Sequence, residues 1–70
     1  MKAIQLDHDM LLAAARVMES EGGSFAGHIA RAFYVADAYN REKLLSAFDD
    51  LFIKFYKAHM RDVRNREMNV

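Results

Sequence analysis

The chain has 70 residues, no cysteine, and ten basic side chains balanced by ten acidic ones. A chain of this length forms one small domain, here residues 1–70, and buries only about 60% of its unfolded surface, so a hydrophobic content of 53% favours self-association. The sequence excludes disulfides, thiolate metal sites and any apolar run of roughly 18 residues, and it starts without a signal-peptide pattern, so we expect a soluble cytoplasmic protein without a membrane partner.

The residue types favour helix throughout. Proline is absent, β-branched residues are scattered without a period of two, and alanine, leucine, methionine, glutamate, lysine and arginine dominate. This composition predicts an all-α fold, either a small helical hairpin or a three-helix unit, and we expect it to form a dimer.

The first predicted helix covers about residues 7–21. Asp7 is its expected N-cap, because a carboxylate there can accept a hydrogen bond from the backbone N–H groups of the first turn. Leu11, Ala14 and Met18 then recur at helical spacing and form one apolar stripe. This helix is therefore expected to pack through that stripe.

A glycine pair separates the first helix from the second, which is predicted at about residues 24–38. Gly22 is expected to end the first helix in the left-handed conformation, and Ser24 to cap the next one. The pair indicates a corner and not a phosphate-binding loop, which needs a preceding strand and a lysine before Ser or Thr. Gly27 is expected to allow a close helix approach. The apolar stripe of the second helix comprises Phe25, Ile29, Ala32, Phe33 and Ala36.

The third predicted helix covers about residues 41–66, with Asn40 as its cap and a fraying end beyond Arg66. Two alternatives are open for its middle: a continuous helix, or a break at Asp49, with Asp49 capping a new segment that starts at Asp50. Its apolar stripe comprises Leu44, Phe48, Leu51, Phe52 and Phe55, broadened by Leu45 and Tyr56. Two short helices cannot cover so wide a stripe, so we expect Leu51, Phe52, Phe55 and Tyr56 at a homodimer interface.

Charge is unevenly distributed along the chain. Residues 1–53 carry five basic and eight acidic side chains, whereas residues 54–70 carry five basic and two acidic ones. Four of the basic residues at the C-terminal end fall within about 80° of a helical wheel. They are Lys54, Lys57, Arg61 and Arg64. This basic row is either a solvated helix face, whose cations favour the negative C-terminal end of the helix dipole, or a row that follows the phosphates of a nucleic acid.

The pattern of polar residues disfavours an enzyme. The three histidines are not paired at helical spacing, so the sequence indicates no metal site. Neighbouring Asp49 and Asp50 point to different sides of a helix and cannot form a carboxylate dyad. We therefore expect no catalytic residue, no metal and no cofactor.

One long stretch, residues 18–52, resembles a group of small uncharacterised helical proteins encoded by phages and prophages. The resemblance implies a protein of an infected or lysogenic bacterial host, and the class of small phage proteins that bind a host protein. It implies no activity and no catalytic residue. It rests on Glu21-Gly22-Gly23-Ser24-Phe25, Ile29-Ala30, Ala32-Phe33, Ala36-Asp37, Asn40-Arg41, Lys43-Leu44, Ala47-Phe48 and Leu51-Phe52.

These observations lead to one expected function and one alternative. The expected function is that of a phage accessory protein that binds a host protein, such as a defence protein or a transcription regulator, and inhibits or redirects it. The alternative is a small dimeric nucleic-acid-binding module that uses the basic C-terminal helix. Aromatic and arginine side chains supply most interface hot spots. The expected partner-binding residues are therefore Phe52, Phe55, Tyr56, Lys57, Arg61 and Arg64.

Overall fold

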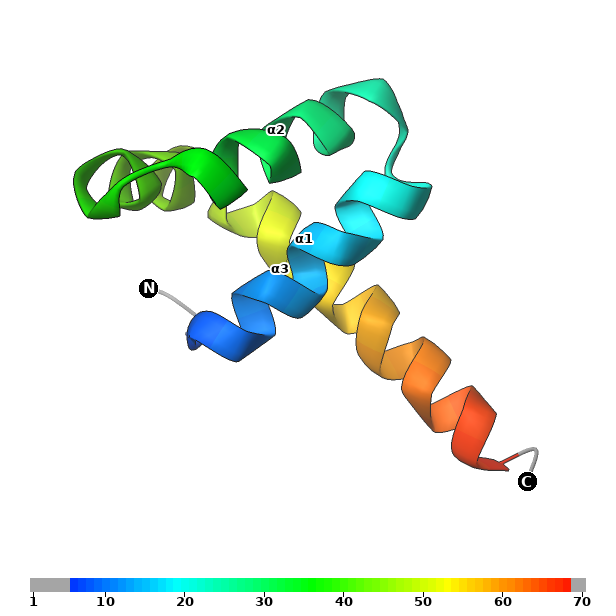
Figure 1. Ribbon diagram of the computed structural model, residues 1–70. Helices are drawn as coiled ribbons and strands as arrows, with labels where there is room; N and C mark the ends of the chain where they lie inside the picture. Colours follow the sequence, from blue (N-terminus) through cyan, green and yellow to red (C-terminus); the bar gives the residue numbers. More distant parts are fainter. Residues whose placement is uncertain (1–5, 69–70) are drawn as a thin grey trace.

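The computed structural model describes residues 6–68 and contains three helices and no strand within them. They are α1 (His8–Glu21), α2 (Gly23–Val35) and α3 (Ala38–Met68), and they account for 92% of the described residues (Figure 1). The all-α prediction is confirmed. No helix in this part of the chain is long and apolar enough to cross a membrane. The expected fraying end falls partly on residues 69–70, which lie outside the described residues.

Aspartates cap the first and the third helix. The Oδ1 atom of Asp7 accepts a hydrogen bond from the Met10 N–H at 2.9 Å, which confirms the predicted cap of α1. In α3 the prediction of Asn40 was wrong, because the cap is Asp37. Its Oδ1 accepts from the Asn40 N–H at 2.9 Å, and its carbonyl oxygen accepts from the Arg41 N–H at 2.8 Å. The helix therefore starts earlier than expected, and Asn40 lies in its first turn.

The α1–α2 corner uses both glycines, but in the reverse of the predicted order. Gly23 holds the left-handed conformation, with φ of 83°, whereas Gly22 has φ of −84°. Ser24 is not the cap but lies inside α2. Gly22 is required for a different reason: a Cβ atom there would lie 2.6 Å from both the Ala26 Cβ and the Met18 carbonyl oxygen. The corner is thus set by close packing at one glycine and by backbone conformation at the next.

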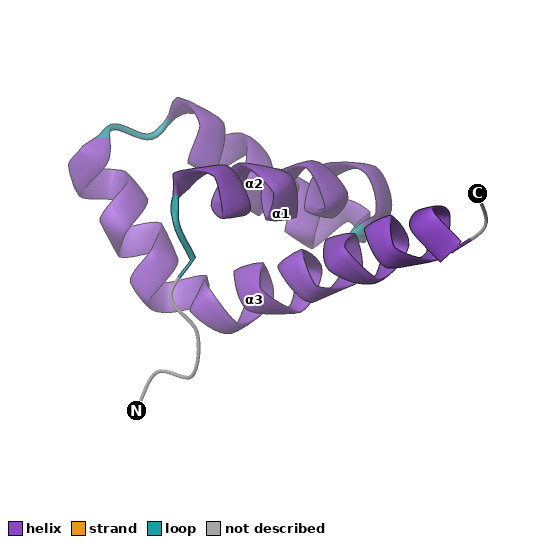
Figure 2. Ribbon diagram, turned by 90° about the horizontal axis from the view of Figure 1, so that it is seen from below, coloured by secondary structure: helices purple, strands orange, loops and turns teal. Residues whose placement is uncertain are grey.

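The core is organised around α1. Both other helices pack against it, whereas α2 and α3 touch each other over a much shorter stretch, and α1 lies in front of the angle that they form (Figure 2). Small α1 and α2 residues let the backbones approach, and aromatic rings fill the centre. Phe33 and Phe52 are both fully buried, with ring centroids 5.3 Å apart. The core cluster comprises Leu11, Ala14, Ala15, Met18, Ala26, Ala30, Phe33 and Phe52.

Near its middle, α3 is kinked. Phe48 has the non-helical angles φ −126° and ψ 28°, so the structure has the broken form of this helix and not the continuous one. Beyond the kink, the carboxylates of Asp49 and Asp50 accept hydrogen bonds from the N–H groups of Asp50 and Leu51, at 2.8 and 2.9 Å. Both hydrogen bonds lie directly beyond the residue at which the backbone leaves helical geometry.

Arg41 ties the start of α3 to the end of α2. Its Nη2 donates a hydrogen bond to the Phe33 carbonyl oxygen at 3.1 Å, and its guanidinium carbon lies 4.3 Å from the centroid of the Phe33 ring. The Nε atom is buried without a hydrogen-bond partner, which offsets part of this stabilisation. Arg41 thus holds together two helices that share few other contacts.

Tyr34 ties α2 to α1. Burial raises the pKa of its phenol, and the nearby charge of Glu19 and a side-chain hydrogen bond with it raise that pKa further, while Arg16 acts in the opposite direction. The folded state therefore favours the neutral phenol at this position.

Candidate partner-binding surface

The predicted basic row lies on the part of α3 that follows the kink. Lys54, Lys57, Arg61 and Arg64 are all exposed. Figure 1 shows the last turns of α3 extending beyond the place where α1 crosses it. Part of the row therefore stands at the side of the α1–α3 contact, and part stands beyond it.

Beside this contact, an open hollow of about 650 Å³ lies between the end of α1 and α3. We call it the α1–α3 hollow. Its apolar residues are Val17 from α1 and Ile53, Phe55 and Ala58 from α3. Its basic residues are Lys54, Lys57 and Arg61, and its acidic residues are Glu21 and Asp50. An apolar patch flanked by charges of both signs is typical of a protein contact surface with a polar rim.

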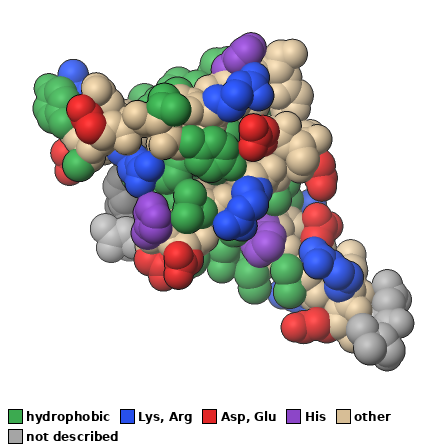
Figure 3. Space-filling view, viewed as in Figure 1, with side chains coloured by type: hydrophobic (Ala, Val, Ile, Leu, Met, Phe, Trp, Pro, Cys, Tyr) green, Lys and Arg blue, Asp and Glu red, His purple; other side chains and the backbone are tan. Residues whose placement is uncertain are grey.

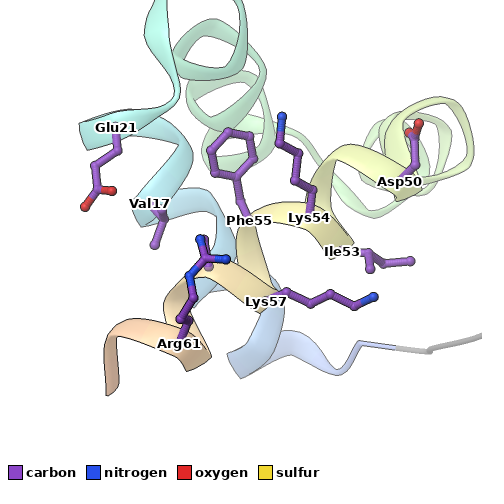
Figure 4. A pocket seen from close by; sticks show the side chains of 9 residues that line it. Val17, Glu21, Asp50, Ile53, Lys54, Phe55, Lys57 and Arg61 are labelled. Carbon is purple, nitrogen blue, oxygen red and sulfur yellow. The ribbon is translucent and has the colours of Figure 1, made fainter. Parts of the chain in front are cut away.

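The side chains around this hollow point in different directions. In Figure 4 the Arg61 side chain is directed back toward Val17 and Phe55, whereas the Lys57 and Lys54 side chains extend away from Arg61. The Lys54 Nζ atom lies 5.4 Å from the centroid of the Phe55 ring. The three cations therefore do not converge on one point, and the hollow offers a spread of charges and not a single anion site.

The predicted aromatic residues divide into two kinds. Phe52 is 1% exposed and packs in the core, so it has no surface to offer a partner, and its assignment to a contact surface or a dimer interface fails. Leu51, Phe55 and Tyr56 are half-buried and pack against the core cluster. These residues are not free because α1 packs over the apolar stripe of α3, whereas the sequence pattern did not show which helix would cover that stripe. Of the predicted site residues, Phe55, Lys57 and Arg61 line the hollow together.

The remaining predicted residues lie outside the hollow. Tyr56 stands beside His59, with ring centroids 6.2 Å apart, and Arg64 is exposed further along α3. Sequence reasoning did not find the contribution of Val17 and Glu21, because nothing in the sequence indicates that the end of α1 meets α3. Asp49 and Asp50 lie about one helical turn before Lys54, the first residue of the basic row, and this could have indicated that acidic side chains flank the row.

Charges of both signs also alternate on the visible surface of this end of the molecule (Figure 3). Among the described residues, no group of three or more histidine, cysteine, aspartate or glutamate side chains could hold a metal ion. No protein-family model matches the chain, and comparisons with the curated proteins and with the solved structures gave no significant match. Inference about function therefore rests on this surface and on the sequence.

Proposed function

We propose that this protein is a non-enzymatic phage accessory protein that binds a host protein in the bacterial cytoplasm and inhibits or redirects it. The observation that carries the proposal is the α1–α3 hollow, in which Phe55 and Arg61 meet Val17 and Glu21 from another helix. The apolar residues supply area that gains from burial, and the charges supply orientation and steering.

The partner surface that fits this hollow is partly apolar and mainly acidic. Three basic side chains line the hollow against two acidic ones, and Arg64 adds a further cation beyond it. An acidic patch on the partner would pair with the cations, while basic groups at its edge would meet Glu21 and Asp50. Such mixed complementarity favours one partner orientation over others.

The nucleic-acid alternative is weaker for the same reason. Glu21 and Asp50 stand among the cations, and a phosphate backbone would meet like charge at both. Domains that bind nucleic acid usually present a basic stripe without such interruptions, and this chain carries no net charge at pH 7.

The test is capture of a partner from a bacterial lysate by the tagged protein, followed by mass spectrometry. One stoichiometric host protein should be captured by the wild type and lost with Arg61→Glu. The matched control is Arg31→Glu, which makes the same charge change at an exposed position of α2 and should leave capture intact. Circular dichroism checks that both variants are folded.

Two results would contradict the proposal. In one, Arg61→Glu and Arg31→Glu capture the same host protein equally well, so the hollow plays no part. In the other, only nucleic acid is captured and nuclease treatment removes it, with binding that weakens steeply as salt rises. The second result would support the nucleic-acid-binding module instead.

We also propose that the protein acts as a homodimer. The support is the small size of its core and the exposure of large apolar side chains, among them Val35 at 85% and Phe25 at 61%. These residues lie on α2, away from the interface expected from the sequence.

A further inference from the structure

The charged residues on one side of the α1–α3 hollow form a single row along α3, which we call the charged row. It comprises Asp50, Lys54, Lys57, Arg61 and Arg64, all of them exposed, and the first four line the hollow. The residues follow one another at intervals of four or three, so they lie within about 80° of one another around the helix. The charged row thus begins with one negative charge and continues with four positive ones.

The positive part of the charged row is not neutralised by the described part of the chain. Within residues 6–68, no acidic side chain forms an ion pair with Lys57, Arg61 or Arg64. Side chains three and four residues apart are neighbours on a helix surface, so these like charges repel one another. A surface that brings carboxylates to the row removes this repulsion, whereas an apolar or basic surface does not.

The intervals between the cations match those between side chains on another helix. At 1.5 Å per residue, α3 rises about 6 Å from Lys57 to Arg61 and about 4.5 Å from Arg61 to Arg64. Carboxylates three and four residues apart on a helix that lies along α3 rise by the same steps. Three side chains on one face of a strand span about 13 Å, against about 10.5 Å for the three cations. The row therefore fits a helix better than a strand.

The α1–α3 hollow offers apolar surface to such a helix. Figure 1 shows the end of α1 and the second half of α3 diverging from the place where they cross, and the hollow lies between them. Its apolar lining comes from both helices, with Val17 from α1 and Ile53, Phe55 and Ala58 from α3. A helix placed there can pack apolar side chains against both α1 and α3.

We propose that the α1–α3 hollow binds one amphipathic acidic helix of the partner protein, with its apolar side in the hollow and its carboxylates, one helical turn apart, on the cations of the charged row. This inference rests on the proposed binding of a host protein, because it names the element of that protein that is bound. Asp50 sets the direction of the helix. A basic side chain at one end pairs with Asp50, whereas the reversed helix brings a carboxylate to it.

The test starts from a displayed library of random peptides about four helical turns long, selected for binding to the tagged protein. Selected peptides should share an apolar residue and acidic residues three and four positions apart. A proline in the middle of such a peptide should abolish binding, because proline breaks a helix.

Arg61→Glu then shows whether the charged row makes the contact. Fluorescence anisotropy with a selected peptide should give an affinity at least about tenfold weaker, and a peptide with one carboxylate changed to lysine should restore it. That restoration is not expected from a merely misfolded variant. The matched control is Arg66→Glu, an exposed position about 140° around α3 from Arg61, which should keep the wild-type affinity at physiological salt.

Several results overturn the proposal: no selected peptide, peptides without acidic residues or with them at every second position, and binding that Arg61→Glu leaves unchanged. Tighter binding of duplex DNA than of the peptide overturns it too. So does a change in the mass of the protein alone with Arg61→Glu, since the row then meets a second copy. If no peptide is selected but Arg61→Glu still abolishes capture of a host protein, the proposed function stands and only the single helix is wrong.

Discussion

Two sides of α2 and α3 are built from similar residues but filled differently: the side that meets α1, and the side that lines a shallow groove between α2 and the first half of α3. We call the latter the α2–α3 groove, and its apolar residues are Ala32, Val35, Ala36, Leu44, Ala47 and Phe48. On the α1 side, the Phe33 and Phe52 rings pack against each other at a tilt in the core and are fully buried. On the groove side, Phe25 and Phe48 form a comparable ring pair, yet Phe25 remains 61% exposed. The difference is the presence of α1, whose small residues let its backbone lie close to both helices.

This contrast shows that an aromatic stripe does not by itself mark a binding surface. The stripe through Phe52 and Phe55 is the most apolar part of α3, and α1 covers much of it. Among the described residues, most of the exposed large apolar side chains instead lie on α2 or at the start of α3, at Phe25, Tyr34, Val35 and Tyr39, and one more, Met60, lies on the second half of α3. Much of the uncovered apolar surface therefore lies outside the α3 stripe that the sequence pattern marks.

Removal of one aromatic ring from each side should give the largest difference in stability between the two sides. Phe52→Ala should lower the free energy of unfolding by about 3–5 kcal/mol, because it leaves a cavity in the core. Phe25→Ala makes the same chemical change at an exposed ring and should cost less than about 1 kcal/mol. Urea unfolding of both variants at one protein concentration measures the difference. Equal costs would mean that the groove side is as well packed as the α1 side.

Removal of the Arg41 side chain should test what holds the start of α3 against the end of α2. Arg41→Ala should cost about 2 kcal/mol, because a charge-assisted hydrogen bond to the Phe33 carbonyl and the contact with the Phe33 ring are lost. Arg41→Lys keeps the charge without the planar group and should fall between. Arg31→Ala, at an exposed arginine of α2, is the control and should change stability little. A cost near zero for Arg41→Ala would show that α1 alone positions both helices.

The smallest expected effect is a pH dependence at the α1–α2 contact. The pKa of Tyr34 is raised above the ordinary tyrosine value of about 10, so the folded protein holds the phenol proton more tightly than the unfolded chain. The stabilisation is complete below the unfolded pKa and is lost as pH rises through the folded one. Wild type should therefore lose more stability above about pH 10 than Tyr34→Phe does. Parallel alkaline unfolding curves for the two proteins would contradict this.

Local signals in the sequence are sufficient for the helices and for some of their ends. Asp7 caps α1 as expected, because capping depends on a carboxylate and the first turn of one helix. The prediction was wrong at Ser24 and Asn40, where another residue nearby could also begin the helix. At the glycine pair, composition predicted a corner but could not tell which glycine takes the left-handed conformation, because Gly22 is chosen by contact with Ala26.

For the candidate binding surface, too, some features could be predicted from the sequence and others could not. Spacing alone placed Lys57, Arg61 and Arg64 on one side of a helix, and the structure leaves all three exposed. Spacing could not assign Phe52 to the core or bring Val17 and Glu21 beside Arg61, because both depend on where α1 crosses α3. A helical wheel gives the direction of a side chain but not the identity of the helix that covers it.

The sequence by itself determined that the chain is helical, that it turns at the glycine pair, and that a basic row lies on the C-terminal part of the third helix. These features depend on interactions within a few residues, whose geometry the backbone fixes locally. Only the tertiary structure decided which apolar row became core and which stayed exposed. That choice depends on how three helices fit against one another, since side-chain shape at each crossing selects the angle at which two helices pack.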